Sequence, residues 1–170
     1  MNVSSPGDDP EDETADYLHM VRDLPSTPEA IYTAWTDLAR ITSWWGPEGF
    51  LVPPDRVISH KHVGGEYRAC LINAVTGDEF WWGGEYLILA PPLQLRLTQR
   101  WEEEDGTPTG PQTVIDVGMQ SLPDRTQPVT RMTFRQGPFT GDRELVDYEG
   151  RWNASFSRLA GYLARHRGPD

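Results

Sequence analysis

The stretch Glu144–Leu163, ELVDYEGRWNASFSRLAGYL, decides the fold of this chain. Its apolar residues recur three and four positions apart, which is the spacing of one face of an α-helix. These residues are Leu145, Tyr148, Trp152, Phe156, Leu159 and Leu163. A helix so aromatic on one side must lie against an apolar surface, because burial of the rings is what stabilises it. The sequence therefore predicts a long C-terminal helix packed on the strand-rich segments that precede it.

The composition indicates one acidic globular domain. A chain of 170 residues can build one substantial core, and 37% hydrophobic residues with 11% aromatics exclude wholesale disorder. The net charge of −11 at pH 7 repels phosphate backbones and anionic lipids, so we expect no nucleic-acid partner and no membrane insertion. A neutral or cationic ligand fits this charge better.

Cys70 is the only cysteine, so the chain has no internal disulfide and we expect a reducing, cytoplasmic setting. Residues 1–14 are rich in Ser, Pro, Gly, Asp and Glu, with neither a basic start nor an apolar stretch. They read as a disordered acidic tail and not as a secretory signal or a membrane anchor.

The domain begins with a strand and two helices. Ala15–Leu24 alternates loosely and predicts a first strand. Ser26 and Glu29 have capping-box spacing, and Pro28 suits the first turn of a helix because its missing N–H is not needed there. A second short helix is expected over Leu38–Trp45, ended by the Gly-Pro pair that follows.

From Asp55 the pattern changes to alternation with turn punctuation, which predicts six further strands. They are Asp55–His60, Gly65–Asn73, Glu79–Leu89, Gln94–Glu102, Thr113–Leu122 and Thr130–Gln136. The links between them are short, so neighbouring strands should pair as antiparallel hairpins. Strands followed by one long helix make an α+β domain.

Several short motifs, in this order and spacing, resemble the START-like superfamily, in the branch named for the activator of heat-shock protein 90 ATPase. The first are PEAIYTAWTD at 28–37, WWGP at 44–47 and GGEY at 64–67. The later ones are GEY at 84–86 with Pro91-Pro92, LT at 97–98 with Trp101, TRMTF at 130–134, and GRW at 150–152 leading into Leu159 and Tyr162-Leu163. Together they cover roughly residues 15 to 166.

The resemblance implies a helix-grip fold for residues 15–167. In this fold a curved antiparallel sheet of about seven strands grips the C-terminal helix, with two short helices after the first strand. Relatives hold hydrophobic molecules between sheet and helix, and the superfamily includes lipid carriers, hormone receptors, cyclases and proteins that sequester metabolites. Fold alone therefore does not settle the function.

The aromatic residues that should face the interior are the candidate ligand-binding residues. They are Trp35, Trp44, Trp45, Phe80, Trp82, Tyr86, Trp101, Phe134, Trp152 and Phe156. Such rings can frame a pocket of roughly 300–1,000 Å³ or fill a core, and the sequence does not separate the two outcomes. We expect a pocket, because the fold that the chain resembles usually has one. No cofactor is expected.

The position of two tryptophan pairs in the sequence says more about where their side chains lie. Trp44 and Trp45 lie where the pocket mouth would be, so they form either a lid or part of the core. Adjacent strand residues point to opposite faces, which places only one of Trp81 and Trp82 inside. The same alternation puts Phe80, Trp82 and Tyr86 on one face, provided that no bulge intervenes at the nearby glycines.

The polar candidates are fewer. Arg68 and Arg100 either project into the cavity and bind a ligand oxygen or face solvent. His60 and His62 form a surface pair without a third ligand at metal-binding spacing, so no metal site is expected. Cys70 reads as a buried small hydrophobe, and no catalytic residue can be named.

These observations favour binding of a hydrophobic, aromatic or polycyclic small molecule. One alternative is a polyketide cyclase- or dehydratase-like enzyme, for which the sequence offers His60, His62, Arg68 and Glu85 without convergent geometry. The other is interaction with the chaperone, which would use an outer surface. A homodimer remains open, since no feature of the sequence demands one.

Overall fold

The computed structural model describes residues 16–166. The predicted acidic tail, residues 1–14, lies outside this range, as do the two end residues of the predicted domain, 15 and 167. The strands are β1 Asp16–Leu24, β2 Phe50–Leu51, β3 Val57–Ser59, β4 Glu66–Asn73, β5 Glu79–Ala90, β6 Gln94–Glu102, β7 Thr113–Ser121 and β8 Thr130–Phe139. The helices are α1 Pro28–Thr36, α2 Leu38–Ile41, the 3₁₀ turn η1 Pro54–Arg56, and α3 Asp142–Arg165.

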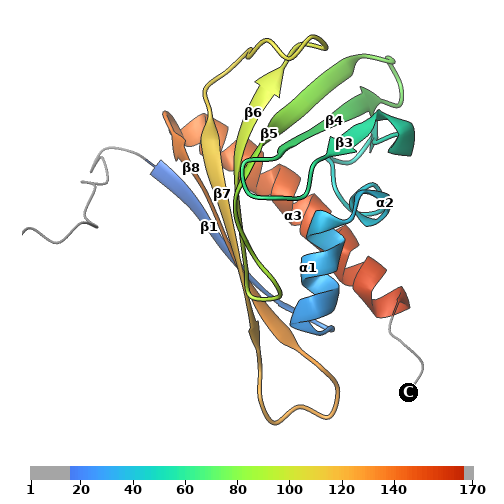
Figure 1. Ribbon diagram of the computed structural model, residues 1–170, viewed down its shortest axis with the longest axis vertical. Coiled ribbons are helices and arrows are strands. Elements are labelled where there is room, and N and C mark those ends of the chain that lie inside the picture. The colour runs from blue at the N-terminus through green and yellow to red at the C-terminus, as the bar shows by residue number, and fades with distance from the viewer. Residues whose placement is uncertain (1–15, 167–170) are drawn as a thin grey trace, which may run out of the picture.

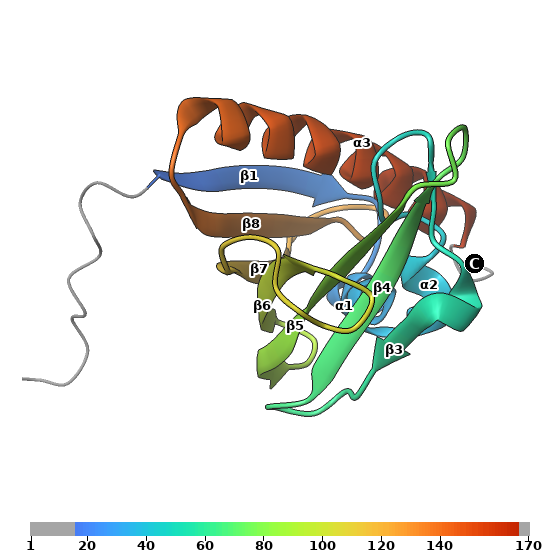
Figure 2. The same ribbon diagram turned by 90° about the horizontal axis from the view of Figure 1, so that it is seen from above.

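Within the described range, eight strands form one antiparallel sheet in the order β1-β8-β7-β6-β5-β4-β2, and β3 also pairs with β4. The sheet curves around α3, and α1 and α2 lie beside the C-terminal half of that helix (Figures 1 and 2). The predicted α+β helix-grip fold is therefore confirmed. The strand that the sequence analysis missed is β2, which has two residues and follows a Gly-Pro turn.

Two local predictions at the helices were wrong. The N-cap of α1 is Thr27, whose Oγ1 accepts a hydrogen bond from the N–H of Ala30 at 3.2 Å, so Ser26 and Glu29 form no capping box. Ser26 instead uses its carbonyl to accept from the Thr130 hydroxyl of β8 at 2.7 Å. Helix α2 ends at Ile41, because the chain turns there to bring Trp44 and Trp45 inward.

At the centre of the core, aromatic rings from three segments that are far apart in the sequence contact one another. Trp152 of α3 lies with its ring centroid 5.7 Å from Trp35 of α1 and 4.6 Å from Phe134 of β8. Phe156, one helical turn further on, lies 5.3 Å from Trp152 and 5.2 Å from Phe134. All four rings are at most 5% exposed. Their burial fixes α3 and α1 on the concave face of the sheet.

A polar chain runs through this apolar core. The Trp152 indole N–H donates to the Gln136 side-chain oxygen at 2.8 Å. The Gln136 amide then donates to the Gln99 side-chain oxygen at 3.1 Å and to the Thr113 hydroxyl at 2.9 Å. Loss of one partner would leave a buried polar group unpaired, at a cost of about 1–3 kcal/mol. This hydrogen-bond network therefore fixes the rotation of α3 over β6, β7 and β8.

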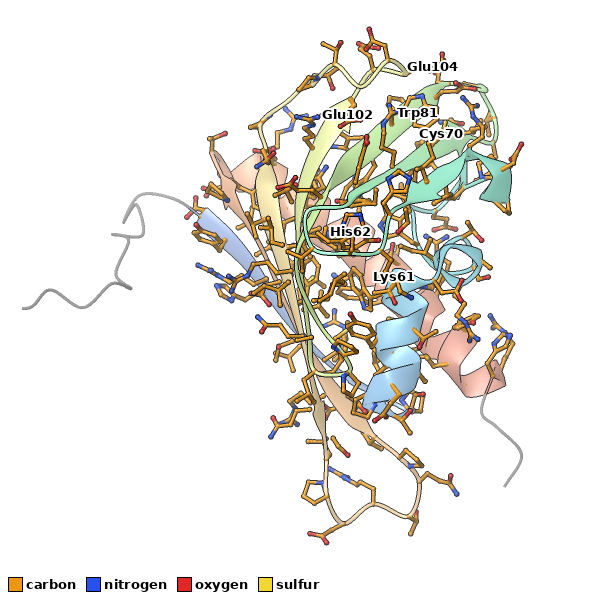
Figure 3. All side chains as sticks on the ribbon, viewed as in Figure 1. Lys61, His62, Cys70, Trp81, Glu102 and Glu104 are labelled. Carbon is orange, nitrogen blue, oxygen red and sulfur yellow. The ribbon has the colours of Figure 1, made fainter. Side chains whose placement is uncertain are left out.

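The convex face of the sheet carries a buried ion cluster. The carboxylate of Glu102 accepts from the Arg68 Nε at 2.7 Å and from the Arg100 Nε at 2.8 Å, and its side chain is only 2% exposed. It lies over Gly83, where an added Cβ would come within 2.8 Å of it. The Arg68 guanidinium also stacks on Trp81, 4.6 Å from the ring centroid. Figure 3 shows Glu102, Trp81 and Cys70 at the same end of the sheet.

This cluster predicts a large effect of one nearly isosteric change. Glu102→Gln should lower the free energy of unfolding by about 3 kcal/mol, because the largely buried guanidinium of Arg68 and the partly exposed one of Arg100 lose their shared, buried counter-charge. The measurement is urea unfolding followed by circular dichroism. Asp116→Asn is the control, since the Asp116 side chain is 25% exposed, against 2% for Glu102, and its pair with Arg96 should contribute less than about 1 kcal/mol. Equal losses in the two variants would contradict a special role for the cluster.

Candidate functional site

Most of the space between sheet and helix is filled by the protein's own rings. An inner pocket remains between α1, β3 and the centre of the sheet, with a volume of about 40 Å³. Its walls include Trp35, Ile41, Tyr86, Ile115 and Trp152. A water molecule needs about 10–15 Å³ measured in this way, so the pocket has room for a few small groups and not for a polycyclic ligand. The expectation of a roomy interior cavity is therefore wrong for this structure.

A second interior space of about 30 Å³ lies on the other side of three indoles. Trp45, Trp82 and Trp152 line both this middle space and the inner pocket, so they form the partition between the two. Trp82 meets Trp45 at a centroid distance of 5.0 Å and Trp152 at 6.0 Å, both edge to face. The partition therefore consists only of side chains.

An outer hollow of about 570 Å³ continues from the middle space to the surface. The two share four lining residues, Pro47, Leu71, Trp101 and Arg151. Phe50, Phe80 and Trp81 also line the hollow. The ring centroids of Phe50 and Phe80 lie 5.9 Å apart, and Phe80 is 45% exposed. This hollow has the volume that small-molecule sites usually have, roughly 300–1,000 Å³.

The structure divides the predicted ligand-binding residues into three groups. The inner pocket and the partition contain Trp35, Tyr86, Trp45, Trp82 and Trp152. The outer hollow contains Phe80 and Trp101. Trp44, Phe134 and Phe156 line none of these three spaces and pack as core. Which aromatic residues line a space depends on tertiary packing, so the sequence pattern could not make this division.

The alternation predicted for β5 is present. The register between β5 and β6 is continuous from Trp81 to Tyr86 and shifts only between Tyr86 and Ile88, beyond the glycines. Phe80, Trp82 and Tyr86 therefore share the concave face, while Trp81 lies on the convex face beside Arg68. Phe80 differs from the other two because it lies at the start of the strand, where the hollow opens.

The two candidate arginines do not offer their guanidinium groups to a ligand. Both are engaged with Glu102 on the convex face. Arg68 also donates to the carbonyl oxygens of Glu103 and Glu104, each at 3.0 Å. It thereby fixes the start of the loop that forms one wall of the outer hollow. Arg68 positions this wall, which is a role that the sequence analysis did not weigh.

The remaining polar candidates form no reactive site. His60 and His62 are exposed in the loop after β3, which ends at Ser59, so they share no strand face. Figure 3 shows His62 in this loop, away from Glu102 and Trp81. Within residues 16–166 no three His, Cys, Asp or Glu side chains lie together in a way that could hold a metal ion. The cyclase alternative thus gains no acid–base pair from the two histidines.

The ionisable groups around the inner pocket are already engaged. Asp37 accepts from the N–H of Ala39 at 3.0 Å, which caps α2, and it pairs with Arg40. Burial raises the pKa of Tyr67 and of Tyr86, so both hydroxyls stay protonated near neutral pH. This arrangement supplies hydrogen-bond donors and no free general base.

Of the residues that line the outer hollow, sequence reasoning named only Phe80 and Trp101 as ligand-binding, and three of the others show why. Phe50 lies in the unpredicted strand β2, Pro47 was taken as a helix stop, and Arg151 lies on the polar side of the α3 pattern. Arg151 is exposed, and its guanidinium lies 5.6 Å from the ring centroid of Tyr148, which accepts from the Trp101 N–H at 2.8 Å. The position of Arg151 one residue before Trp152 was the only available signal.

A curved antiparallel sheet closed around a C-terminal helix, with aromatic residues between them, defines the helix-grip class of the START-like superfamily. The family model described as "Activator of Hsp90 ATPase homolog 1-like protein" matches residues 25–164, and the chain belongs to this family.

Solved structures of bacterial proteins share the fold. Protein CV1439 from Chromobacterium violaceum is 25% identical, with a TM-score of 0.72 over 91% of this chain and 99% of its own. The AHSA1 protein SPO3351 from Silicibacter pomeroyi is 23% identical, with a TM-score of 0.77 over 89% and 100%. CalU16 from Micromonospora echinospora is 17% identical, with a TM-score of 0.61 over 88% and 76%. No curated protein matches the chain significantly in sequence.

Among residues 16–166, no helix combines the length and the apolar character needed to cross a bilayer. Helix α3 has the length, but charged side chains cover its outer side.

Cys70 gives a direct test of the packing beneath the convex face of the sheet. It is fully buried beneath the convex face, and burial raises the pKa of its thiol, so less of the reactive thiolate is present at any pH. We expect Ellman's reagent at pH 8 to leave the folded protein unmodified for hours and to react at once in 6 M guanidinium chloride. Rapid stoichiometric reaction of the folded protein would contradict the burial of Cys70.

Proposed function

We propose that this protein binds a small, flat, apolar molecule at the aromatic opening between the sheet and α3. The observation that carries the proposal is the outer hollow of about 570 Å³, which has aromatic walls and leads inward to the indole partition. The ligand would enter the hollow against Phe80 and Trp101 and reach toward Trp45, Trp82 and Trp152. The site thus lies further out than the internal cavity between sheet and helix that the sequence analysis expected.

Exposed aromatic surface supports this proposal. Phe80 and Phe50 contact each other at the rim, and Phe80 keeps 45% of its surface in water. A flat ligand that covers this ring gains about 25 cal/mol for each Å² of apolar surface removed from water. The burial of half of one phenyl side chain then contributes about 1.5 kcal/mol, which is about a tenfold change in affinity.

The charges at the rim favour an uncharged ligand. The carboxylates of Glu79 and Glu102 are paired with arginines, and hydrogen bonding to Arg56 lowers the pKa of Glu79. In the part of the chain that the structure describes, Glu103 and Arg151 form no ion pair, and they border the hollow with opposite signs. The rim therefore carries no excess of one sign near the aromatic rings.

The family description names an activator of the ATPase of heat-shock protein 90. The features that carry our proposal lie on the concave side of the sheet, so stimulation of that ATPase is not part of it. A cytoplasmic location remains part of the proposal, because the single cysteine suits a reducing compartment.

Fluorescence of the neutral dye N-phenyl-1-naphthylamine tests the site. We expect saturable binding with enhanced emission, and Phe80→Ala should weaken it about tenfold, because the ring that covers the dye is lost. Val146→Ala is the matched control, since Val146 is an apolar residue on α3 that is 64% exposed and lines none of the three spaces. Absence of saturable binding, or equal weakening in both variants, would refute the proposed site.

A further inference from the structure

One wall residue of the inner pocket has a buried hydrogen-bond donor without an acceptor. Trp35 lines this pocket and is only 5% exposed, and its Nε1 has no hydrogen-bond partner. An unpaired buried N–H costs about 1–3 kcal/mol, so such a group in a native protein calls for an explanation. We propose that Trp35 Nε1 donates to an uncharged oxygen acceptor, a carbonyl or an ether, on the bound molecule. The inference rests on the proposed function and specifies the class of ligand.

The neighbours of Trp35 explain why its N–H is unpaired. Its ring is surrounded by the apolar rings of Trp44, Phe134, Trp152 and Phe156, with centroids 4.9 to 6.2 Å away. These rings offer no strong acceptor.

The other indole donors of the same core show the contrast. The N–H of Trp44 donates to the Ala34 carbonyl at 2.9 Å, and that of Trp152 donates to Gln136 at 2.8 Å. The N–H of Trp101 donates to the Tyr148 hydroxyl at 2.8 Å. The core thus supplies an acceptor to these three indoles and leaves Trp35, in the wall of the inner pocket, without one.

The other polar groups of the pocket also favour an acceptor on the ligand. The hydroxyls of Ser59 and Tyr86 lie 2.7 Å apart and bond to each other, which uses one of their two hydrogens and leaves the other free to donate. The Tyr67 hydroxyl donates to the Thr98 carbonyl. One hydroxyl hydrogen of the pair formed by Ser59 and Tyr86 is therefore free to donate to an acceptor on the ligand, in addition to the Trp35 N–H.

The charge of the pocket excludes a carboxylate. The nearby cation, Arg68, is engaged by Glu102 on the convex face, and Asp37 in the wall is paired with Arg40, so neither arginine is a free counter-charge. An anionic group would thus be buried without a counter-charge, at a cost of several kcal/mol. An uncharged oxygen carries no such cost.

The volumes indicate how the ligand would lie. The inner pocket of about 40 Å³ accommodates a carbonyl group but not the ring that carries it. The ring would occupy the place of the partition, where Trp45 separates the inner pocket from the middle space. Trp45 follows the end of α2 and precedes Gly46, whose φ of 111° suits only glycine. Displacement of this indole would join the inner pocket to the outer hollow.

Two probes of nearly the same shape test the inference. 1-Indanone and indane share one bicyclic skeleton and differ by a carbonyl oxygen. We expect 1-indanone to bind the wild-type protein about fivefold more tightly, which is the gain from one buried hydrogen bond. In ¹H–¹⁵N spectra, the Trp35 indole signal should move downfield with 1-indanone and much less with indane. Trp35→Phe assigns this signal and should remove the preference for the ketone.

Trp44→Phe is the matched control, because it also removes an interior indole N–H but one that is already bonded. It should keep the ketone preference. Equal affinities for the two probes, or a ketone preference without movement of the Trp35 signal, would overturn the inference while leaving the proposed function intact. Failure of both probes to bind would count against both. If Trp35→Phe does not fold, nuclear Overhauser contacts from the assigned backbone identify the Trp35 indole signal in the wild-type protein, and the wild-type spectra still decide the matter.

Discussion

The structure depends on the position of the Trp152 ring. This one side chain contacts Trp35 of α1 and Phe134 of β8, and its N–H is bonded to Gln136. Ring stacking fixes the distance between helix and sheet, and the hydrogen bond fixes the rotation of α3 about its axis. An apolar residue at this position could supply the first constraint but not the second. The positions of the curved sheet and of the two short helices relative to α3 therefore both depend on this one side chain.

The same packing determines what the protein can hold. Aromatic rings that grip the helix also fill the interior, so the remaining volume is split into two small spaces and one open hollow. The partition between them consists of indoles that meet edge to face, an arrangement worth about 0.5–1.5 kcal/mol for each pair. Because these side chains line both interior spaces, rotation of Trp45 would join the two without a change in the backbone.

The sequence predicted the fold well because its signals are local. The strand Gln94–Glu102 and the aromatic face of α3 follow from alternation and helical spacing alone. β2 was missed because two residues show no period, and the N-cap was misplaced by one residue because Ser26 and Thr27 are both good caps. For the site, alternation placed Phe80, but the pairing of Arg68 with Glu102 depends on strands that meet only in the folded sheet.

The pairing of β1 with β8 has a consequence for how the molecule forms. Leu24 lies opposite Thr130, so the first strand finds its partner more than a hundred positions later in the chain. Contacts between such distant segments slow folding, because a long loop must close before they stabilise anything. During synthesis β1 and α1 must wait for β8 and α3 to emerge from the ribosome. Until then their apolar residues are open to chaperones and to aggregation.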